Sequence, residues 1–147
     1  MSPFRQTSLL VLLLSALACK ETSGPSVVTA TFALHDINGR VLPTFLAATP
    51  GFTTTIVSGS LTLDDSGRAS IVEHRIEGNG TETDDTASYN YKISGNKIDF
   101  ESSVICIAVD GCPAPPVATI VGGGLSVDRY PSGGAGIVYN YRIAQPD

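Results

Sequence analysis

Cys106 and Cys112 are the side chains whose type and spacing most directly suggest chemistry in this 147-residue chain. Five residues separate them, so the C-x-x-C spacing of redox and metal motifs is absent. Between them, Asp110 and Gly111 offer a tight turn that would bring the two sulfurs together. In an oxidising compartment a disulfide is the default use of such a pair. We therefore predict a Cys106–Cys112 disulfide, with a labile redox pair as the alternative.

The two histidines, His35 and His74, each have a carboxylate beside them in sequence, Asp36 and Glu73 respectively. Neighbours on a strand point to opposite faces, so neither pair is expected to be a preformed acid–base couple. A zinc site needs three or four convergent ligands, which would have to come from distant strands. We predict surface histidines, no metal site and no catalytic residue.

Two acidic stretches and one glycine run complete the candidates for chemistry. Residues 64–65 and 82–85 carry carboxylates that suit calcium, but neither follows the EF-hand pattern, and we interpret them as solvated loop charge. Gly122–Gly124 lacks the Lys-Ser/Thr of a phosphate loop, so we expect a bulge or bend inside a strand. No Gly-x-Ser-x-Gly elbow is present. We therefore predict no cofactor and a protein that is not an enzyme.

The N-terminus has the features of an export signal. Arg5 precedes an apolar run over residues 9–18, which has the length of a signal-peptide core and is too short to span a bilayer. Ala18 then precedes Cys19. This pattern resembles the lipobox of bacterial lipoproteins, in which the cysteine is acylated and becomes the new N-terminus. The alternative is an ordinary A-x-A cleavage site at residues 16–18, which would release a secreted or periplasmic soluble protein.

The number of cysteines favours lipidation. Pairing Cys106 with Cys112 leaves Cys19 as an odd thiol, which is unusual in an oxidising compartment unless the thiol has another use. We predict a signal peptide at 1–18, a lipidated cysteine and tether at 19–26, and a folded domain at 27–147. The resemblance implies a bacterial cell envelope location. Lys20 is not the aspartate that retains lipoproteins in the inner membrane, which favours the outer membrane.

The mature chain would be one small acidic domain. Removing residues 1–18 leaves 129 residues and takes away Arg5 as the only charged side chain, so eight Lys and Arg residues stand against fourteen Asp and Glu residues. This balance, without a basic patch, argues against nucleic acid and against electrostatic attachment to anionic lipid. We predict no nucleic-acid partner and a covalent link to the membrane through Cys19.

From residue 27 onward the pattern is that of strands joined by turns. We predict about eight strands, at 27–35, 40–46, 53–64, 68–77, 87–94, 97–109, 117–128 and 136–144. Asn38-Gly39 is a strong hairpin turn, Pro43 marks an edge or bend, and residues 78–86 read as a polar acidic loop. We predict an all-β, up-and-down antiparallel meander closed into a small barrel, because closure covers both the apolar face and the edges. An open β-sandwich is the alternative.

Alternation along these strands predicts which residues face the interior. The inward set is Leu61, Leu63, Tyr89, Tyr91, Ile93, Ile98, Phe100, Leu125, Val127, Ile137, Tyr139 and Tyr141. An eight-stranded barrel is filled by side chains or holds one small ligand. The candidate ligand-lining residues are Tyr89, Tyr91, Tyr139, Tyr141 and Phe100, since a buried phenol needs a polar partner. The alternative places the tyrosines at the barrel mouths with their hydroxyls in water.

Several short motifs extend along most of residues 27–144. They are Phe32–Gly39 followed by Leu42-Pro43, the Ser-Gly-x-Leu-Thr-Leu strand at 58–63, the Ser-Gly-Asn-x-Ile turn at 94–98, and the terminal Tyr-x-Tyr strand. With the lipobox-like start, they resemble small bacterial lipoproteins that carry a lipocalin-like domain. The Gly-x-Trp signature of true lipocalins is absent, as the chain has no tryptophan. The resemblance implies a lipocalin-like β-barrel.

Taken together, these patterns predict an envelope-anchored lipoprotein with a non-enzymatic binding or structural role. One alternative is a carrier of a small amphipathic ligand inside the barrel. Another is a protein-interaction or inhibitor module that contacts an envelope protein through loops 47–53, 78–86 and 110–117.

Overall fold

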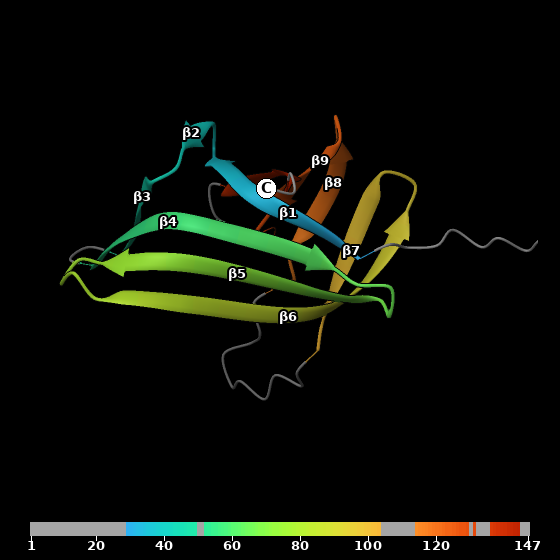
Figure 1. The fold of residues 1–147 in the computed structure, drawn as a ribbon, viewed down its shortest axis with the longest axis horizontal. Coiled ribbons are helices and arrows are strands. Elements are labelled where there is room, and N and C mark those ends of the chain that lie inside the picture. The colour runs from blue at the N-terminus through green and yellow to red at the C-terminus, as the bar shows by residue number, and fades with distance from the viewer. Residues whose placement is uncertain (1–28, 50–51, 104–113, 130, 132–135, 145–147) are drawn as a thin grey trace, which may run out of the picture.

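The computed structural model describes residues 29–49, 52–103, 114–129, 131 and 136–144, and within these ranges the chain forms ten β-strands and no helix (Figure 1). The strands are β1 (Ala30–Ile37), β2 (Arg40–Val41), β3 (Thr44–Thr49), β4 (Phe52–Leu63), β5 (Arg68–Glu77), β6 (Glu82–Ser94), β7 (Lys97–Ser102), β8 (Val117–Val121), β9 (Gly124–Asp128) and β10 (Val138–Ile143).

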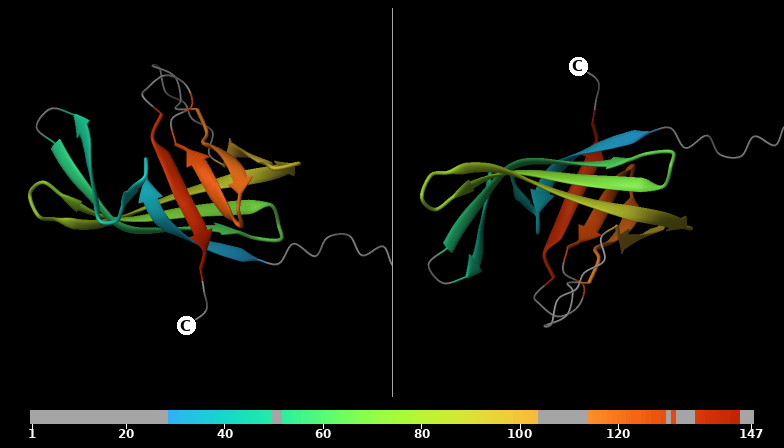
Figure 2. Two further views of the ribbon diagram at one scale, coloured as in Figure 1. Left: turned by 90° about the horizontal axis from the view of Figure 1, so that it is seen from above. Right: turned by 90° about the horizontal axis from the view of Figure 1, so that it is seen from below.

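The strands form an antiparallel sheet that closes on itself. The order is β2-β1-β10-β9-β8-β7-β6-β5-β4-β3, and β1 also pairs with β4. That last pairing closes β1 and β4 to β10 into an eight-stranded barrel and leaves β2 and β3 outside the ring. The predicted all-β, up-and-down, lipocalin-like barrel is therefore confirmed over the open sandwich. In Figure 2, β10 crosses the long strands β4 to β6 at a steep angle.

The long strands extend past the closed ring at one end. Residues 60–63 of β4 pair with β1, whereas residues 52–56 pair with β3. We call this the distal end; it carries the turns at 38–39 and 78–81. The opposite, proximal end carries the turns at 64–67, 95–96 and 122–123 and the start of β1. In Figure 1 the start of β1 lies next to the β4–β5 turn at the right of the view.

Two predicted elements differ from the structure although the number of barrel strands is right. Residues 117–128 are not one bent strand but β8 and β9, joined at Gly122 and Gly123. These glycines have φ angles of +57° and +80°, the pair of left-handed conformations that a two-residue hairpin requires and that glycine adopts without steric cost. Residues 40–46 do not form a barrel strand. They divide into β2 and β3, with a cis Leu42–Pro43 peptide between them.

The acidic stretch expected as a loop at 78–86 is also partly strand. Only residues 78–81 form the turn, and β6 begins at Glu82. The strand continues because residues 82–85 pair with residues 73–76 of β5, where His74 and Arg75 face the carboxylates. The predicted Asn38-Gly39 turn is confirmed, with φ angles of +52° and +77°.

Two β-bulges change which residues face the interior. In β1 the register shifts between Leu34 and Asp36, and in β4 it shifts between Ile56 and Ser58. A bulge puts two residues opposite one, so the alternation of faces restarts after it. Leu34 and Ile37 are consequently both buried although three positions separate them.

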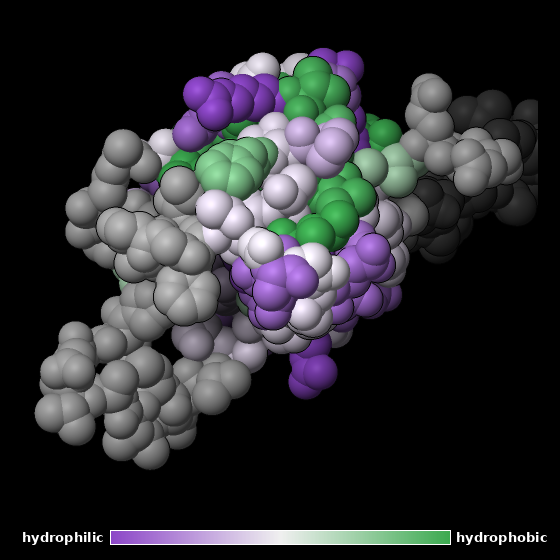
Figure 3. Space-filling model, turned by 90° about the vertical axis from the view of Figure 1, so that its left-hand side faces the viewer, coloured by the Kyte–Doolittle hydropathy of each residue, from purple (hydrophilic) through white to green (hydrophobic). Residues whose placement is uncertain are grey.

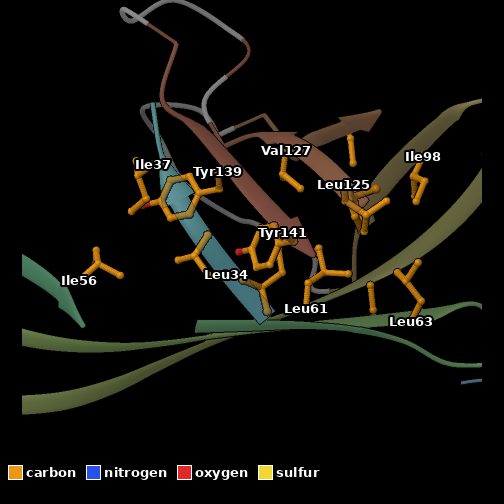
Figure 4. Close-up of a cluster of buried hydrophobic side chains, with 14 residues drawn as sticks. Leu34, Ile37, Ile56, Leu61, Leu63, Ile98, Leu125, Val127, Tyr139 and Tyr141 are labelled. Atoms are coloured by element: carbon orange, nitrogen blue, oxygen red, sulfur yellow. The ribbon is translucent and has the colours of Figure 1, made fainter. Parts of the chain in front are cut away.

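The barrel core agrees largely with the predicted inward set. Figure 4 shows Tyr139 and Tyr141 of β10 pointing into the same space as Leu34 and Ile37 of β1 and Leu61 of β4. Of the predicted set, Tyr89, Tyr91 and Ile137 are partly buried against the core, and Ile93 is wrong because it is 49% exposed near the proximal end. The core also contains residues that the prediction left out: Leu34, Ile37, Ile56, Ala69, Ile71 and Ala118.

Candidate functional site

A buried carboxylate lies inside the barrel. Glu73 is 1% exposed and continues the two-residue period of Ala69 and Ile71 along β5, so it faces the same interior. Gly59 lies directly opposite on β4, where a side chain would begin 3.1 Å from Leu34. The absence of a side chain at Gly59 therefore leaves the room that Leu34 occupies beside the cluster.

Two arginines neutralise this carboxylate. Oε2 of Glu73 accepts hydrogen bonds from Nη2 of Arg75 at 2.7 Å and from Nε at 3.2 Å. Oε1 lies 3.0 Å from Nη2 of Arg129, an ion pair whose geometry does not make a hydrogen bond. Arg75 also donates to Oδ2 of Asp85 at 2.7 Å. Two cations and two carboxylates thus balance, as the high cost of an unpaired buried charge requires.

Arg129 reaches this cluster from the end of β9. It continues the inward period of Leu125 and Val127, and its side chain is only 9% exposed. The guanidinium carbon lies 5.6 Å from the centre of the Tyr139 ring, a cation–π contact. Burial lowers the pKa of Arg129, but the charge of Glu73 and smaller contributions from Tyr141, Tyr89 and Tyr139 together outweigh it, so the pKa lies above its ordinary value. Arg129 is therefore charged inside the barrel.

Tyr141 adds a neutral polar group to the interior. Its side chain is 1% exposed, and its hydroxyl has no hydrogen-bond partner among the described residues. Burial raises the pKa of Tyr141 well above the ordinary value. Buried polar atoms are normally hydrogen-bonded. Among the described residues, three buried side-chain atoms in this region lack a hydrogen-bond partner: the Tyr141 hydroxyl, Nε of Arg129 and Oε1 of Glu73.

The five aromatic residues predicted to line a ligand have different environments. Phe100, Tyr139 and Tyr141 belong to the packed core. Tyr89 is partly buried, and its ring packs against that of Phe100 with centroids 5.7 Å apart and planes tilted by 59°. Tyr91 donates from its hydroxyl to the Asp64 carbonyl at 2.7 Å near the proximal end. Of these five, Tyr89 and Phe100 fill space by contacting each other, and a role in ligand binding stays a prediction.

Two hollows open on the outer side of the sheet. One, of about 460 Å³, is lined mainly by Thr62, Arg68, Ser70, Ser88 and Asn90. The other, of about 510 Å³, is lined mainly by Asp36, residues 121–124, Ser126, Asn140 and Arg142. The polar side chains named here lie on strand positions that alternate with buried residues. Both hollows therefore belong to the outer surface.

One expectation about the histidines is wrong. Nδ1 of His35 lies 3.1 Å from Oδ2 of Asp36, although neighbours on a strand were expected to diverge. The bulge explains the contact, because it places His35 and Asp36 together opposite Asn140. Partial burial raises the pKa of Asp36, but hydrogen bonds from Asn140, His35 and the Gly39 amide outweigh it, so the pKa lies below its ordinary value.

The second histidine pairs across strands rather than along its own. Nδ1 of His74 lies 2.7 Å from Oδ1 of Asp84, and Nε2 lies 3.8 Å from Oε2 of Glu82. Glu73 points to the opposite face, as expected. His35 on β1 and His74 on β5 therefore belong to separate pairs. Within the described ranges, no group of three or more His, Cys, Asp or Glu residues is arranged to hold a metal ion.

The acidic stretches have partners within the chain. Oδ1 of Asp64 accepts three hydrogen bonds, from the amide and hydroxyl of Ser66 and from the amide of Arg68, at 2.7 to 2.9 Å. The hydrogen bond from the Ser66 hydroxyl is the largest influence on this carboxyl, and the pKa of Asp64 lies below its ordinary value. Asp64 thus shapes the β4–β5 turn, and the half-exposed Asp85 pairs with Arg75 at the edge of the cluster formed by Glu73, Arg75 and Arg129.

The buried cluster was missed by the sequence reasoning, although a signal was present. The alternation that places Ala69 and Ile71 inward continues to Glu73 and Arg75, and that of β9 continues to Arg129. A buried charge is indicated where an ionisable residue occupies a strand position whose side chain faces the interior. The predictions for Cys19, Cys106 and Cys112 fall outside the described residues.

Within the described ranges, no helix is long and apolar enough to cross a membrane. No family model, curated protein or solved structure matches this chain.

Proposed function

We propose that this chain is an envelope-anchored lipoprotein whose barrel acts as a non-enzymatic binding module on its outer surface. The packed interior carries this proposal. Phe100, Tyr139 and Tyr141 join the core, and the Glu73–Arg129 ion pair occupies further space that an internal ligand would need. A filled barrel supports a function on the outside and disfavours the alternative of a carrier.

The position of β1 supports the lipid anchor. Cys19 lies eleven residues before Ala30, where β1 begins at the proximal end. Eleven residues span at most about 40 Å. An acylated Cys19 therefore tethers the barrel through its proximal end, and the distal end lies about 33 Å farther along the ten residues of β5.

The distal end has the properties of a protein-binding surface. Val41 is 66% exposed and Phe45 is 53% exposed. Phe45 lies in register with Thr55, Ile76 and Glu82 on neighbouring strands, so an exposed aromatic ring and a carboxylate share one outer face. Figure 3 shows green apolar areas among polar ones on the side of the molecule that carries β2 and β3. Apolar side chains rimmed by polar ones are typical of interaction sites.

Intact mass tests the anchor. The protein is extracted without reduction from membranes of a Gram-negative host, with Cys19→Ser as the control. We expect a chain that begins at Cys19 and carries two or three acyl groups, with two hydrogens missing for the Cys106–Cys112 disulfide. An unmodified mass for the wild-type chain would refute the anchored form.

In-cell photo-crosslinking tests the binding surface. A photoreactive amino acid at Phe45 is compared with one at Thr62, which faces outward away from the distal end. We expect a discrete cross-linked envelope protein from position 45 only. Equal products from both positions, or none from position 45, would contradict a partner at the distal end.

A further inference from the structure

Exposed apolar side chains gather at the proximal end of the barrel. Of the six large apolar residues that are exposed in the described part of the chain, four lie there: Ile93 (49%), Ile120 (39%), Val121 (59%) and Ile143 (61%). The other two, Val41 and Phe45, belong to the distal end.

The strand register shows that these residues follow one rim. Ile93 pairs with Ile98, which pairs with Ala118, two residues before Ile120. The amide of Ile120 donates to the carbonyl of Asn96 in the β6–β7 turn at 2.7 Å. On the other side, Ile120 pairs with Leu125, and Leu125 pairs with Tyr141, two residues before Ile143. Ile93, Ile120 and Ile143 thus continue the apolar lining of the barrel to an exposed rim, and Val121 adds an apolar side chain on the outer face of the same end.

The chain enters the barrel at this same rim. Ala30 at the start of β1 pairs with Leu63, and the amide of Ala144 donates to the carbonyl of Thr31 at 3.0 Å. The start of β1 therefore lies beside the end of β10, which carries Ile143. A lipid anchor at Cys19 is joined to this rim, and not to the distal end, by at most about 40 Å of chain.

The distribution of charged side chains also distinguishes the two ends of the barrel. At the proximal end, Arg68, Lys92, Lys97 and Arg142 are balanced by Asp64, Asp65, Asp99 and Glu101. At the distal end, Glu77, Glu82, Asp84 and Asp85 outnumber the two arginines there, Arg40 and Arg75, and His74 lies beside Asp84 and Glu82. Anionic lipids repel the acidic end, so charge also orients the proximal end toward a membrane.

We infer that the proximal rim is a membrane-contact surface, whose isoleucine and valine side chains enter the headgroup–acyl boundary of the bilayer that holds the anchor. The inference rests on the proposed lipid anchor and adds an orientation to it. Contact between this rim and the bilayer fixes the orientation of the barrel, so that the distal end points away from the membrane.

The natural lack of tryptophan makes the test direct. Val121→Trp and Val41→Trp each introduce a single tryptophan at positions that are 59% and 66% exposed, at the proximal and distal ends respectively. Each full chain is expressed and processed in the host and purified from its membranes. It is then reconstituted into vesicles of phosphatidylethanolamine and phosphatidylglycerol with brominated acyl chains. We expect blue-shifted, bromine-quenched emission from Trp at position 121 and unquenched emission at position 41.

Equal quenching at both positions, or none at position 121, would overturn the inference. Intact mass of the same preparation reports the anchor separately, so a failed anchor and a failed orientation are distinguishable. Ile143→Asp in the Val121→Trp background is expected to lose most of the quenching while keeping the far-ultraviolet circular dichroism of the parent. If position 121 is instead shielded in detergent and sedimentation shows a dimer, the rim binds a second copy and the inference is wrong.

Discussion

Replacing Glu73 by Gln tests the energetics of the buried cluster. The substitution keeps the size of the side chain and removes the negative charge that faces Arg129. Arg75 keeps Asp85 as a partner at 2.7 Å. The Arg129 side chain is only 9% exposed, and among the described residues Glu73 is the one carboxylate with which it forms an ion pair. The loss of stability therefore arises mainly from Arg129, whose buried positive charge is left unpaired and cannot be removed by deprotonation.

The size of the effect follows from distance and burial. At 3.0 Å and an effective dielectric constant of about 20, the attraction between Glu73 and Arg129 is about 5–6 kcal/mol. Breaking one partner of a buried pair typically costs about 3–5 kcal/mol. A domain of this size loses about 0.25 kcal/mol of stability per kelvin near its midpoint, so the melting temperature should fall by roughly 12–20 °C.

Chemical and thermal unfolding, followed by circular dichroism, measures this loss. Glu101→Gln is the matched control, because Glu101 accepts from Lys92 at 2.7 Å while both side chains are more than half exposed. Exposed pairs contribute at most about 1 kcal/mol. If Glu73→Gln costs no more than Glu101→Gln, the buried pair does not hold Arg129 in place and the reasoning fails. The double variant Glu73→Leu, Arg129→Met should recover most of the stability, because no charge then stays unpaired.

Three further predictions concern single groups. Tyr141→Phe removes a buried hydroxyl without a partner and should leave the melting temperature unchanged or raised, whereas Tyr91→Phe breaks a 2.7 Å hydrogen bond and should cost about 1 kcal/mol. Asp36→Asn should cost about 1–3 kcal/mol in urea unfolding at pH 7. Since the pKa of Asp36 is lowered from 3.8, its contribution is complete above that pH and is lost as the pH falls through the lowered pKa, so wild type and variant should converge toward pH 2. Gly124→Ala should lower the urea midpoint strongly, because its Cβ would collide with the Tyr141 carbonyl, and Gly136→Ala should not.

The sequence was sufficient to predict the architecture because alternation is a local signal. Along β7 and β9, side chains alternate between core and surface, and Ile98, Phe100, Leu125 and Val127 are buried as predicted. The Asn38-Gly39 turn was equally readable, since few dipeptides adopt two positive φ angles.

The errors arose where faces or conformations depend on the partner strand. The bulge at His35 restarts the alternation in β1, and nothing in its sequence indicates which residue is the extra one. Gly122 and Gly123 fit a bulge as well as a hairpin, and only their pairing decides. Glu73 was considered only as the sequence neighbour of His74, and the ion pair that neutralises it comes from Arg129, which approaches from another strand. The alternation along β5 indicates that Glu73 faces inward, but it does not indicate which cation on another strand pairs with it.

The double pairing of β1 has a consequence for biosynthesis. β1 pairs with β4 and with β10. The pairing of β1 is therefore incomplete until β10, more than a hundred residues later in the chain, has been synthesised. A nascent chain that ends before Val138 leaves β1 and β9 with unpaired edges, and such edges invite pairing with other chains. Ring closure therefore cannot precede the synthesis of β10, and the emerging polypeptide stays open until that strand is made.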